Sequence, residues 1–458
     1  MEAEVAGRLC NLSASRVADI RPGTTGSKPR ELIHAQGALF FTAEDGVHGR
    51  ELWISGGPQG AGPALVKDAR PGTATSNPRR LTVAGNKLFF TAEDGVHGRE
   101  LWVSDGTQAG TVMVKDIFPG PLGSAPDQLL AFGGVLYFAA NDGTRGTELW
   151  RSDGTPEGTF LVEDLYAGED LSSPGAPGSS SPRRLTQAGD AFYFVAQAGN
   201  SLRVWRSEGV PGATSLLATA EDSFLLSFTA AGPELFFLLD EQQGQASLWW
   251  GQGAQTQPLR SFPGFYPHEL TPVGETLFFT AGGGEAGLPG DAAGEELWRS
   301  DGTAGGTVKV KDIRPGPESS APGAFAAMNG LLYFAADDGS RGRELWVSNG
   351  TGKGTLLMSE LRPGPGSSSP QGLTVIAGTL FFSAETEGRG REPWVSDGTA
   401  AGTLPLAEIA PGSASSNPTG FVRVSSKVFF TATEASGGEE LWVLPVLPGS
   451  QCSELPVE

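Results

Sequence analysis

The chain has 458 residues, with 67 glycines and 33 prolines, and its 32 basic and 52 acidic residues give a net charge of −20. So acidic a chain is not expected to bind nucleic acid or an anionic membrane, because both require basic surfaces. No stretch reaches the roughly 18 apolar residues of a membrane helix, so membrane insertion is not expected. The acidic opening MEAEVAGRL lacks the apolar core of a signal peptide. We expect an exported chain from which the signal peptide has been removed; a cytosolic protein is the alternative.

The first expected element is a short strand at residues 16–20. It is followed by Arg21-Pro22-Gly23, a sequence that also follows the fourth strand of later repeats. No repeat precedes this strand. Tryptophans then mark nine sites about 48 residues apart, when Trp249 and Trp250 are counted as one. An aromatic triplet precedes each site. The chain is therefore an array of nine similar units.

The second unit shows the expected elements most clearly. Strands are predicted at 78–85, 87–92, 99–104 and 111–117, separated by glycine pairs and Asp-Gly turns. The two middle strands carry apolar residues on both faces, so both faces of each sheet must be covered. Four-stranded units of this length, packed face to face, are typical of a β-propeller.

The last unit, at 418–443, has three strands and lacks the fourth, which residues 16–20 can supply. We therefore expect an all-β chain that forms a single domain over 1–458, a nine-bladed β-propeller with four-stranded antiparallel blades. The N-terminal strand is expected to close the last blade. Eight blades with one defective unit is the fallback.

The two cysteines lie close in sequence to the segments that this closure brings together. We predict a disulfide between Cys10 and Cys452, which indicates an oxidising compartment. Two free thiols in the tails are the alternative. Lipidation of Cys10 is disfavoured because no hydrophobic signal precedes it.

The sequence Ser-Asp-Gly-Thr at 104–107 joins the third and fourth strands of its unit. It is similar to the Asp-box turn of several propellers. An aspartate in such a turn accepts hydrogen bonds from backbone N–H groups two residues on, and glycine takes the positive φ. We predict a structural role for this turn rather than a metal or substrate site.

Aspartates recur in the loop between the second and third strands, at Asp45, Asp94, Asp142 and Asp338. They are expected on the same face as the ends of the fourth strands. Calcium takes roughly six to eight oxygen ligands, so a calcium site here is the one metal hypothesis. The absence of a DxDxDG spacing favours the alternative, a solvated turn capped by its aspartate. No other cofactor is expected.

The repeat Glu100–Thr107, with Gly110 and Thr111, resembles the bacterial ELWxxDGT repeat family. The resemblance covers nearly the whole chain and is weakest at Val204–Gly209 and Leu248–Gly253. It implies an exported, surface-associated protein and brings no catalytic residues with it.

Departures from the repeat are the best pointers to a site, because a ring of equal blades offers a symmetric surface. The fourth and fifth units, at about 183–262, lose the acidic loop, the Asp-Gly-Thr turn and the Val-Lys-Asp-Ile strand. Aromatic rings beside polar groups in the flanking loops suit sugar or peptide binding. The alternative is sequence drift, with Phe265 and Tyr266 packed between blades. We predict a ligand site formed by Tyr166, Asp170, Phe265, Tyr266, His268, Glu285 and Asp291.

Residues suited to catalysis are few. His48 and His97 occupy one repeated loop position, and no GxSxG, HExxH or phosphate-binding loop occurs. We therefore expect a non-catalytic binding or scaffold protein, secreted or at the cell surface and monomeric, whose partner is a glycan or a surface protein. One alternative is a carbohydrate-active enzyme, a glycoside hydrolase or lyase, with its site in the central funnel. The other is a structural spore or matrix component.

Overall fold

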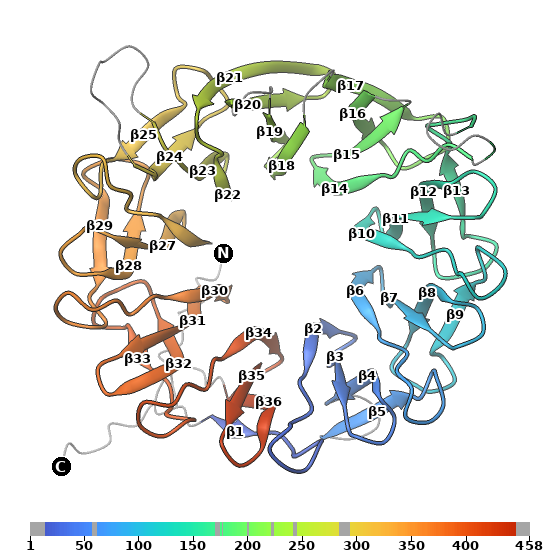
Figure 1. The fold of residues 1–458 in the computed structure, drawn as a ribbon, viewed down its shortest axis with the longest axis horizontal. Coiled ribbons are helices and arrows are strands. Elements are labelled where there is room, and N and C mark those ends of the chain that lie inside the picture. Colours follow the sequence, from blue (N-terminus) through green and yellow to red (C-terminus); the bar gives the residue numbers. More distant parts are fainter. Residues whose placement is uncertain are drawn as a thin grey trace, which may run out of the picture. The chain divides into compact units, whose positions relative to one another are not determined.

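The computed structural model describes residues 14–56, 62–169, 175, 177–198, 201–220, 224–240, 245–283 and 294–445. Its 36 strands form nine four-stranded antiparallel sheets, the blades of a nine-bladed β-propeller (Figure 1). These described ranges contain no helix, and hence none that is long and apolar enough to cross a bilayer. The expected fold class and the count of nine are confirmed, and the fallback of eight blades is wrong.

Each blade takes its four strands in order along the chain, and the last blade takes its fourth from the N-terminus. The first strands are β2 (Arg30–Ala35), β6 (Arg79–Ala84), β10 (Asp127–Phe132), β14 (Arg183–Ala188), β18 (Phe224–Ala231), β22 (His268–Val273), β26 (Gly323–Met328), β30 (Gln371–Ile376) and β34 (Thr419–Val424). The second strands are β3 (Ala38–Glu44), β7 (Lys87–Glu93), β11 (Val135–Asn141), β15 (Ala191–Ala198), β19 (Glu234–Asp240), β23 (Thr276–Ala281), β27 (Leu331–Asp337), β31 (Thr379–Thr386) and β35 (Lys427–Glu434). The third strands are β4 (Arg50–Ser55), β8 (Arg99–Ser104), β12 (Thr147–Ser152), β16 (Ser201–Ser207), β20 (Gln245–Gln252), β24 (Glu296–Ser300), β28 (Arg343–Ser348), β32 (Arg389–Ser396) and β36 (Gly438–Pro445). The fourth strands are β5 (Pro63–Lys67), β9 (Val112–Lys115), β13 (Phe160–Glu163), β17 (Thr214–Ala220), β21 (Gln255–Pro263), β25 (Val308–Lys311), β29 (Thr355–Ser359), β33 (Leu404–Pro405) and β1 (Ser15–Arg16).

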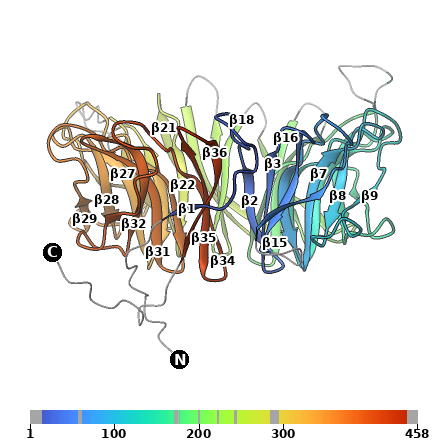
Figure 2. The same ribbon diagram turned by 90° about the horizontal axis from the view of Figure 1, so that it is seen from below.

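The N-terminal strand closes the last blade as expected. Strand β1 lies beside β36 and pairs with it in antiparallel register, Ser15 with Val443 and Arg16 with Trp442 (Figure 2). The Val17 N–H donates to the Leu441 carbonyl at 2.8 Å. The strand is shorter than the predicted 16–20, because beyond Val17 the segment contacts β36 through the Glu440 carboxylate, which accepts from the Arg21 N–H at 3.3 Å, and not through strand pairing. Cys10 and Cys452 lie outside the described residues, so their disulfide stays a prediction.

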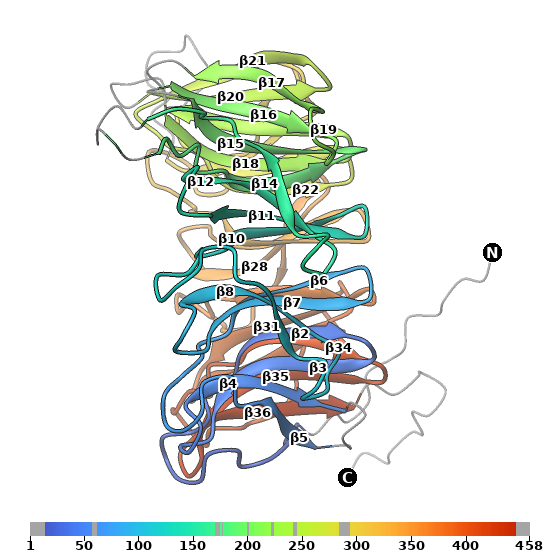
Figure 3. The same cartoon turned by 90° about the vertical axis from the view of Figure 1, so that its right-hand side faces the viewer.

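The chain divides into two compact units. One consists of residues 1–39, 284–298 and 309–458, and the other of residues 40–283 and 299–308. The second unit contains the second to fifth blades in full. Within it the first strands β6, β10, β14, β18 and β22 are neighbours in that order, and the sheets stack face to face (Figure 3).

The core lies between successive blades, as the two-faced strands predict. Between the second and third blades, Phe89 of β7 packs in one buried cluster with Phe138 of β11 and Trp150 of β12. These three side chains are between 0% and 7% exposed, and fully burying one side chain of this kind stabilises the fold by about 1.5–3 kcal/mol. The aromatic triplets and tryptophans of the repeat are therefore architecture.

The Ser-Asp-Gly-Thr turn has the predicted structural role. The Asp105 carboxylate accepts hydrogen bonds from the Thr107 N–H at 2.9 Å and from the Thr107 hydroxyl at 2.7 Å. The Ser104 hydroxyl accepts from the Gly106 N–H at 3.0 Å. These bonds satisfy the polar groups of the turn internally, so the turn is a hairpin closure.

The fourth and fifth blades depart from the repeat in an unexpected way. Their fourth strands do not disappear with the Val-Lys-Asp-Ile sequence; they lengthen, to seven residues in β17 and nine in β21 against four in β9. Strand β21 pairs with β20 along its whole length, from Gln255↔Gln252 to Pro263↔Gln245. In the fifth blade a two-residue turn joins Gln252 to Gln255, so pairing continues to both ends. In the fourth blade the hairpin keeps its span, Ser207↔Thr214, and β17 is longer at its other end, where Ala220 pairs with Leu202.

A buried glutamate ties blades to their successors. Glu100, on β8 of the second blade, is 0% exposed and accepts hydrogen bonds from the Ser124 N–H at 2.7 Å and the Phe118 N–H at 3.3 Å, and from the Ser124 hydroxyl. The Ser124 carbonyl accepts in turn from the Asn141 N–H of β11, in the third blade, at 3.0 Å. Seven such pairs occur in the described residues: Glu51–Ser76, Glu100–Ser124, Glu148–Ser180, Glu296–Ser320, Glu344–Ser368, Glu392–Ser416 and Glu440–Ser27. We call each of them a Glu–Ser clamp.

The clamp predicts a cost for neutralising one glutamate. In Glu100→Gln, an amide N–H₂ faces the buried donors of Ser124 and Phe118, so at least one polar group loses its partner. We expect a loss of about 1–3 kcal/mol in the free energy of unfolding, measured by urea denaturation. The exposed control Glu157→Gln should change it by less than about 0.5 kcal/mol. Equal stability of the two variants would contradict the clamp.

The clamps also predict a pH dependence of stability. Burial raises the pKa of Glu51 and Glu148 from 4.5 to about 7, against the lowering effect of the hydrogen bonds that they accept. Between these values the folded state keeps protons that the unfolded state has lost, so the free energy of unfolding should fall as pH rises from 4.5 to about 7. Urea midpoints measured across this range should show that fall. Glu51→Gln should show a smaller one, and an unchanged slope in the variant would refute the assignment.

Candidate functional site

The first strand of a blade carries a β-bulge, and one residue of the bulge has a left-handed backbone conformation. In β6 the pairing with β7 passes from Arg79↔Thr91 directly to Thr82↔Phe89, which leaves Arg80 and Leu81 opposite a single residue. Arg80 has a φ of 59°, in the left-handed region. The Thr82 hydroxyl donates to the Arg80 carbonyl at 2.9 Å and so closes the bulge.

The same backbone geometry recurs with different side chains. Gln128 of β10 and Arg184 of β14 have φ values of 57°. Gly372 of β30 and Gly420 of β34 occupy the equivalent positions, and glycine adopts a positive φ without strain. The other residues at this position are Glu31 of β2, Glu269 of β22 and Ala324 of β26.

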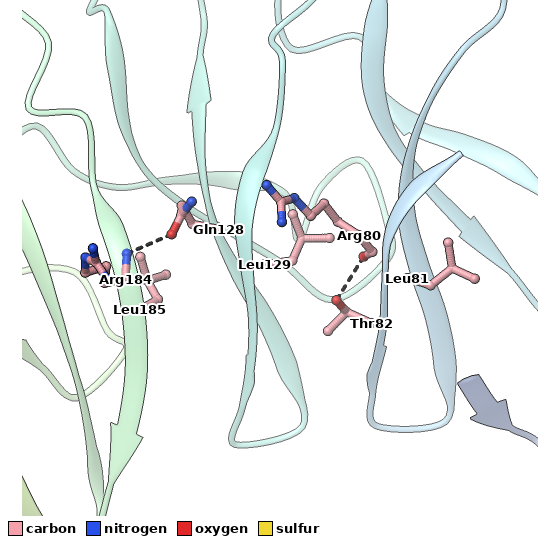
Figure 4. Close-up of a pocket in the computed structure, with 7 residues that line it drawn as sticks. All are labelled: Arg80, Leu81, Thr82, Gln128, Leu129, Arg184 and Leu185. Atoms are coloured by element: carbon pink, nitrogen blue, oxygen red, sulfur yellow. Dashed lines mark hydrogen bonds between the residues drawn. The ribbon is translucent and has the colours of Figure 1, made fainter. Parts of the chain in front are cut away.

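Three of these bulges surround a pocket in the second unit. Its volume is about 340 Å³, and Figure 4 shows its lining side chains on β6, β10 and β14. The lining residues are Arg80, Leu81, Thr82, Gln128, Leu129, Arg184 and Leu185. Each strand thus contributes the bulge residue and the leucine that follows it.

Polar contacts link the three strands across the pocket. Figure 4 shows the Arg80 side chain extending from β6 toward β10, where its Nε lies 2.8 Å from Oδ1 of Asp127. The Gln128 amide bridges the other way: its oxygen accepts from the Arg184 N–H at 2.7 Å, and its nitrogen donates to Asp127 at 3.2 Å. Among the residues that the structure describes, neither Arg183 nor Arg184 forms an ion pair.

The pocket is basic in an acidic chain. Two of its seven lining residues, Arg80 and Arg184, are basic and none is acidic, while the chain as a whole carries 20 more acidic than basic residues. Guanidinium groups bind carboxylates and phosphates through paired hydrogen bonds. No carboxylate, cysteine or histidine is among the seven lining residues. The arrangement therefore suits binding of an anion and lacks the paired carboxylates with which most glycosidases cleave.

The aspartates predicted as metal ligands instead accept hydrogen bonds from residues of their own turns. Asp45 accepts hydrogen bonds from the Val47 and His48 N–H groups, both at 2.8 Å, and lies 2.6 Å from Nδ1 of the His48 ring. Burial opposes them, but these bonds hold the pKa of Asp45 below its ordinary value. Asp94 caps the same turn with His97, and Asp142 and Asp338 cap theirs with Arg145 and Arg341. In the described ranges no cluster of His, Cys, Asp or Glu could hold a metal ion.

The residues of the predicted ligand site do not line the pocket. The Phe265 ring packs on Gly282, and Tyr166 packs on Gly178, where any side chain would collide with each of them. Tyr266 is 46% exposed, with its hydroxyl 3.5 Å from Asp240. His268 is the exposed first residue of β22. Asp170, Glu285 and Asp291 lie outside the described residues.

Sequence reasoning missed Arg80, Gln128 and Arg184. A bulge does not show in an alternating strand pattern, so the sequence does not separate these residues from those of an ordinary edge strand. The available signal was the pair Arg-Arg at 79–80 and 183–184, which two of the nine first strands carry in an acidic chain.

No family model and no curated protein matches the sequence. Among solved structures, the chain is similar to a prolyl endopeptidase (11% identity, 78% of this chain and 54% of that one, TM-score 0.41). It is also similar to a puromycin-hydrolysing peptidase of Mycobacterium tuberculosis (12%, 93% and 62%, 0.41) and to an oligogalacturonate lyase in complex with manganese (12%, 93% and 99%, 0.40). The chain spans 54% to 62% of the length of these two peptidases.

The comparison corrects one expectation. At these identities and TM-scores the likeness extends to the fold alone, and the structures it retrieves are those of enzymes. The expectation of a non-catalytic binding or scaffold protein is therefore wrong by this comparison. Its enzyme alternative is the better supported one.

The bulge geometry predicts opposite effects for two adjacent substitutions. Arg184→Gly should relieve the left-handed backbone strain, which is about 1–2 kcal/mol. Both Arg184→Gly and Arg183→Gly make the unfolded chain more flexible and so lower stability, but Arg183 has a negative φ and no strain to relieve. We expect Arg184→Gly to be more stable than Arg183→Gly by about 1–2 kcal/mol in urea denaturation. Equal midpoints would show that position 184 carries no strain.

Proposed function

We propose that the chain is a carbohydrate-active enzyme whose substrate binds over the first strands β6, β10 and β14. The observation that carries this proposal is the row of bulge residues Arg80, Gln128 and Arg184 around one pocket. Each is held in a strained backbone conformation that glycine would adopt freely, as it does in β30 and β34. Glu31, Glu269 and Ala324 hold the same conformation in other blades, so what distinguishes these three residues is that they line one pocket together.

The chemistry of the lining favours sugars. Residues with guanidinium, amide and hydroxyl groups, on three successive strands, line one pocket together with three leucines. Such a mixture of hydrogen-bonding groups on an apolar floor is typical of small-molecule sites. A row that repeats from blade to blade suits a polymer, because successive sugar units meet successive strands.

Export stays a prediction from the resemblance of Glu100–Thr107 to ELWxxDGT repeats. Polysaccharides outside the cell are substrates that an exported enzyme meets, so the two proposals agree. The predicted Cys10–Cys452 disulfide belongs with the same oxidising location.

Turnover by the full chain tests the proposed function. The chain is incubated with a panel of neutral and acidic polysaccharides, and shortening is followed by size-exclusion chromatography and by new reducing ends. We expect one class to be shortened. Arg80→Ala with Arg184→Ala should lower kcat/KM by roughly a hundredfold or more, because charge-stabilising contacts are lost.

Arg79→Ala with Arg183→Ala is the matched control. It removes the same charge from the same two strands but leaves the pocket lining intact. Loss of activity in the control equal to that in the pocket variant would refute the site. Failure to shorten any polysaccharide in the panel would refute the function.

A further inference from the structure

We infer that the pocket binds the carboxylate of an acidic sugar, so that the substrate class is a uronate-containing glycan. The inference rests on the proposed function, since it names the substrate of that same site. It is carried by Arg80 and Arg184 and by the contacts that Gln128 and Asp127 make with them.

Arg184 is the primary anion-binding group. Its backbone N–H is held by the Gln128 amide oxygen at 2.7 Å, which fixes the bulge, while its guanidinium has no ionic partner within the described residues. A guanidinium offers five N–H donors in a planar fork that matches a carboxylate. The position is therefore prepared for an anion that the described part of the chain does not supply.

Arg80 is prepared differently. Its Nε lies 2.8 Å from Asp127, and both side chains are substantially exposed, at 58% and 46%. Exposed ion pairs are weak, so a substrate carboxylate can compete with Asp127 for Arg80. The Gln128 nitrogen, 3.2 Å from Asp127, holds that carboxylate beside the pocket. Asp127 thus acts as an internal counter-ion that a bound anion displaces.

A glycan fits this surface better than an acidic peptide does. An extended peptide binds a sheet by adding a strand to an exposed edge. Strands β6, β10 and β14 are the edge strands of their blades, but each is interrupted by its bulge at the pocket. A bulge disrupts the ladder that an added strand would need. A sugar chain requires no such ladder, and its hydroxyls can pair with the Thr82 oxygen and the Gln128 amide.

Binding is measured by calorimetry on the full chain, with an oligouronate trimer as the probe. The same trimer with its carboxylates reduced to primary alcohols is the neutral control. We expect the acidic trimer to bind at least roughly tenfold more tightly, with affinity that falls as salt rises. Equal affinity of the two trimers, or tighter binding of a tri-glutamate peptide, would overturn the inference.

Three variants locate the binding. Arg184→Gln should weaken the acidic trimer roughly tenfold to hundredfold, and it keeps the fold because glutamine already occupies this backbone position in β10. Arg183→Gln, which removes the same charge outside the pocket lining, should change affinity less than about threefold. Asp127→Asn should tighten binding about threefold or more, because Arg80 is released. Equal losses in the two arginine variants, or weaker binding by Asp127→Asn, would refute the assigned roles.

The inference and the proposed function can fail separately. Selective binding that depends on Arg184, without shortening of any uronate polymer, would leave the inference standing and remove the enzyme. Shortening of neutral polysaccharides, with no preference for the acidic trimer, would keep the enzyme and overturn the inference.

Discussion

The hydrogen bonds of the buried Glu–Ser clamp are the interaction on which the rest of the structure depends. Each blade is a small sheet that cannot bury its own faces, so its place relative to the next blade must be fixed by something other than strand pairing. A carboxylate that accepts two or three hydrogen bonds from the loop entering the next blade does this. The ionisable group is placed where burial raises its pKa, and removing it leaves several donors unsatisfied.

The clamp also positions the pocket. Ser76, Ser124 and Ser180 each precede the bulge residue of the following first strand by four residues. The carbonyl of each serine accepts a hydrogen bond from the end of the second strand, and the residue after it has a positive φ. The loop therefore enters the first strand in a fixed conformation. Three successive clamps within one compact unit therefore position the bulge residues Arg80, Gln128 and Arg184.

Much of the architecture is predictable from the sequence because it is repeated. The strand at 99–104 was expected at the bounds at which β8 is found, and the missing fourth strand of the last blade led directly to β1. The turn at Asp105 is predictable because its hydrogen bonds join residues that are close together in the sequence. Repetition averages out local ambiguity, since nine copies of one pattern must share one structure.

The pocket was not predictable in the same way, for a physical reason. The bulge at Arg80 depends on pairing with β7 and on the clamp at Ser76, and the residues of β6 alone determine neither of these contacts. Likewise the glutamate of the Glu-Leu-Trp sequence looks like a solvent-facing strand residue until Glu100 is found fully buried against a loop 24 residues later. The ligand site predicted at the loop of Phe265 and Tyr266 stays a prediction; there the Phe265 ring packs on Gly282, and Tyr266 is 46% exposed.

A crystal structure of the chain in complex with an oligouronate tests the central claim most directly. The account predicts electron density for the sugar over β6, β10 and β14, with a carboxylate within hydrogen-bonding distance of the Arg184 guanidinium and Asp127 displaced from Arg80. Density at the loop of Phe265 and Tyr266 instead, with the arginine pocket unoccupied, would contradict it.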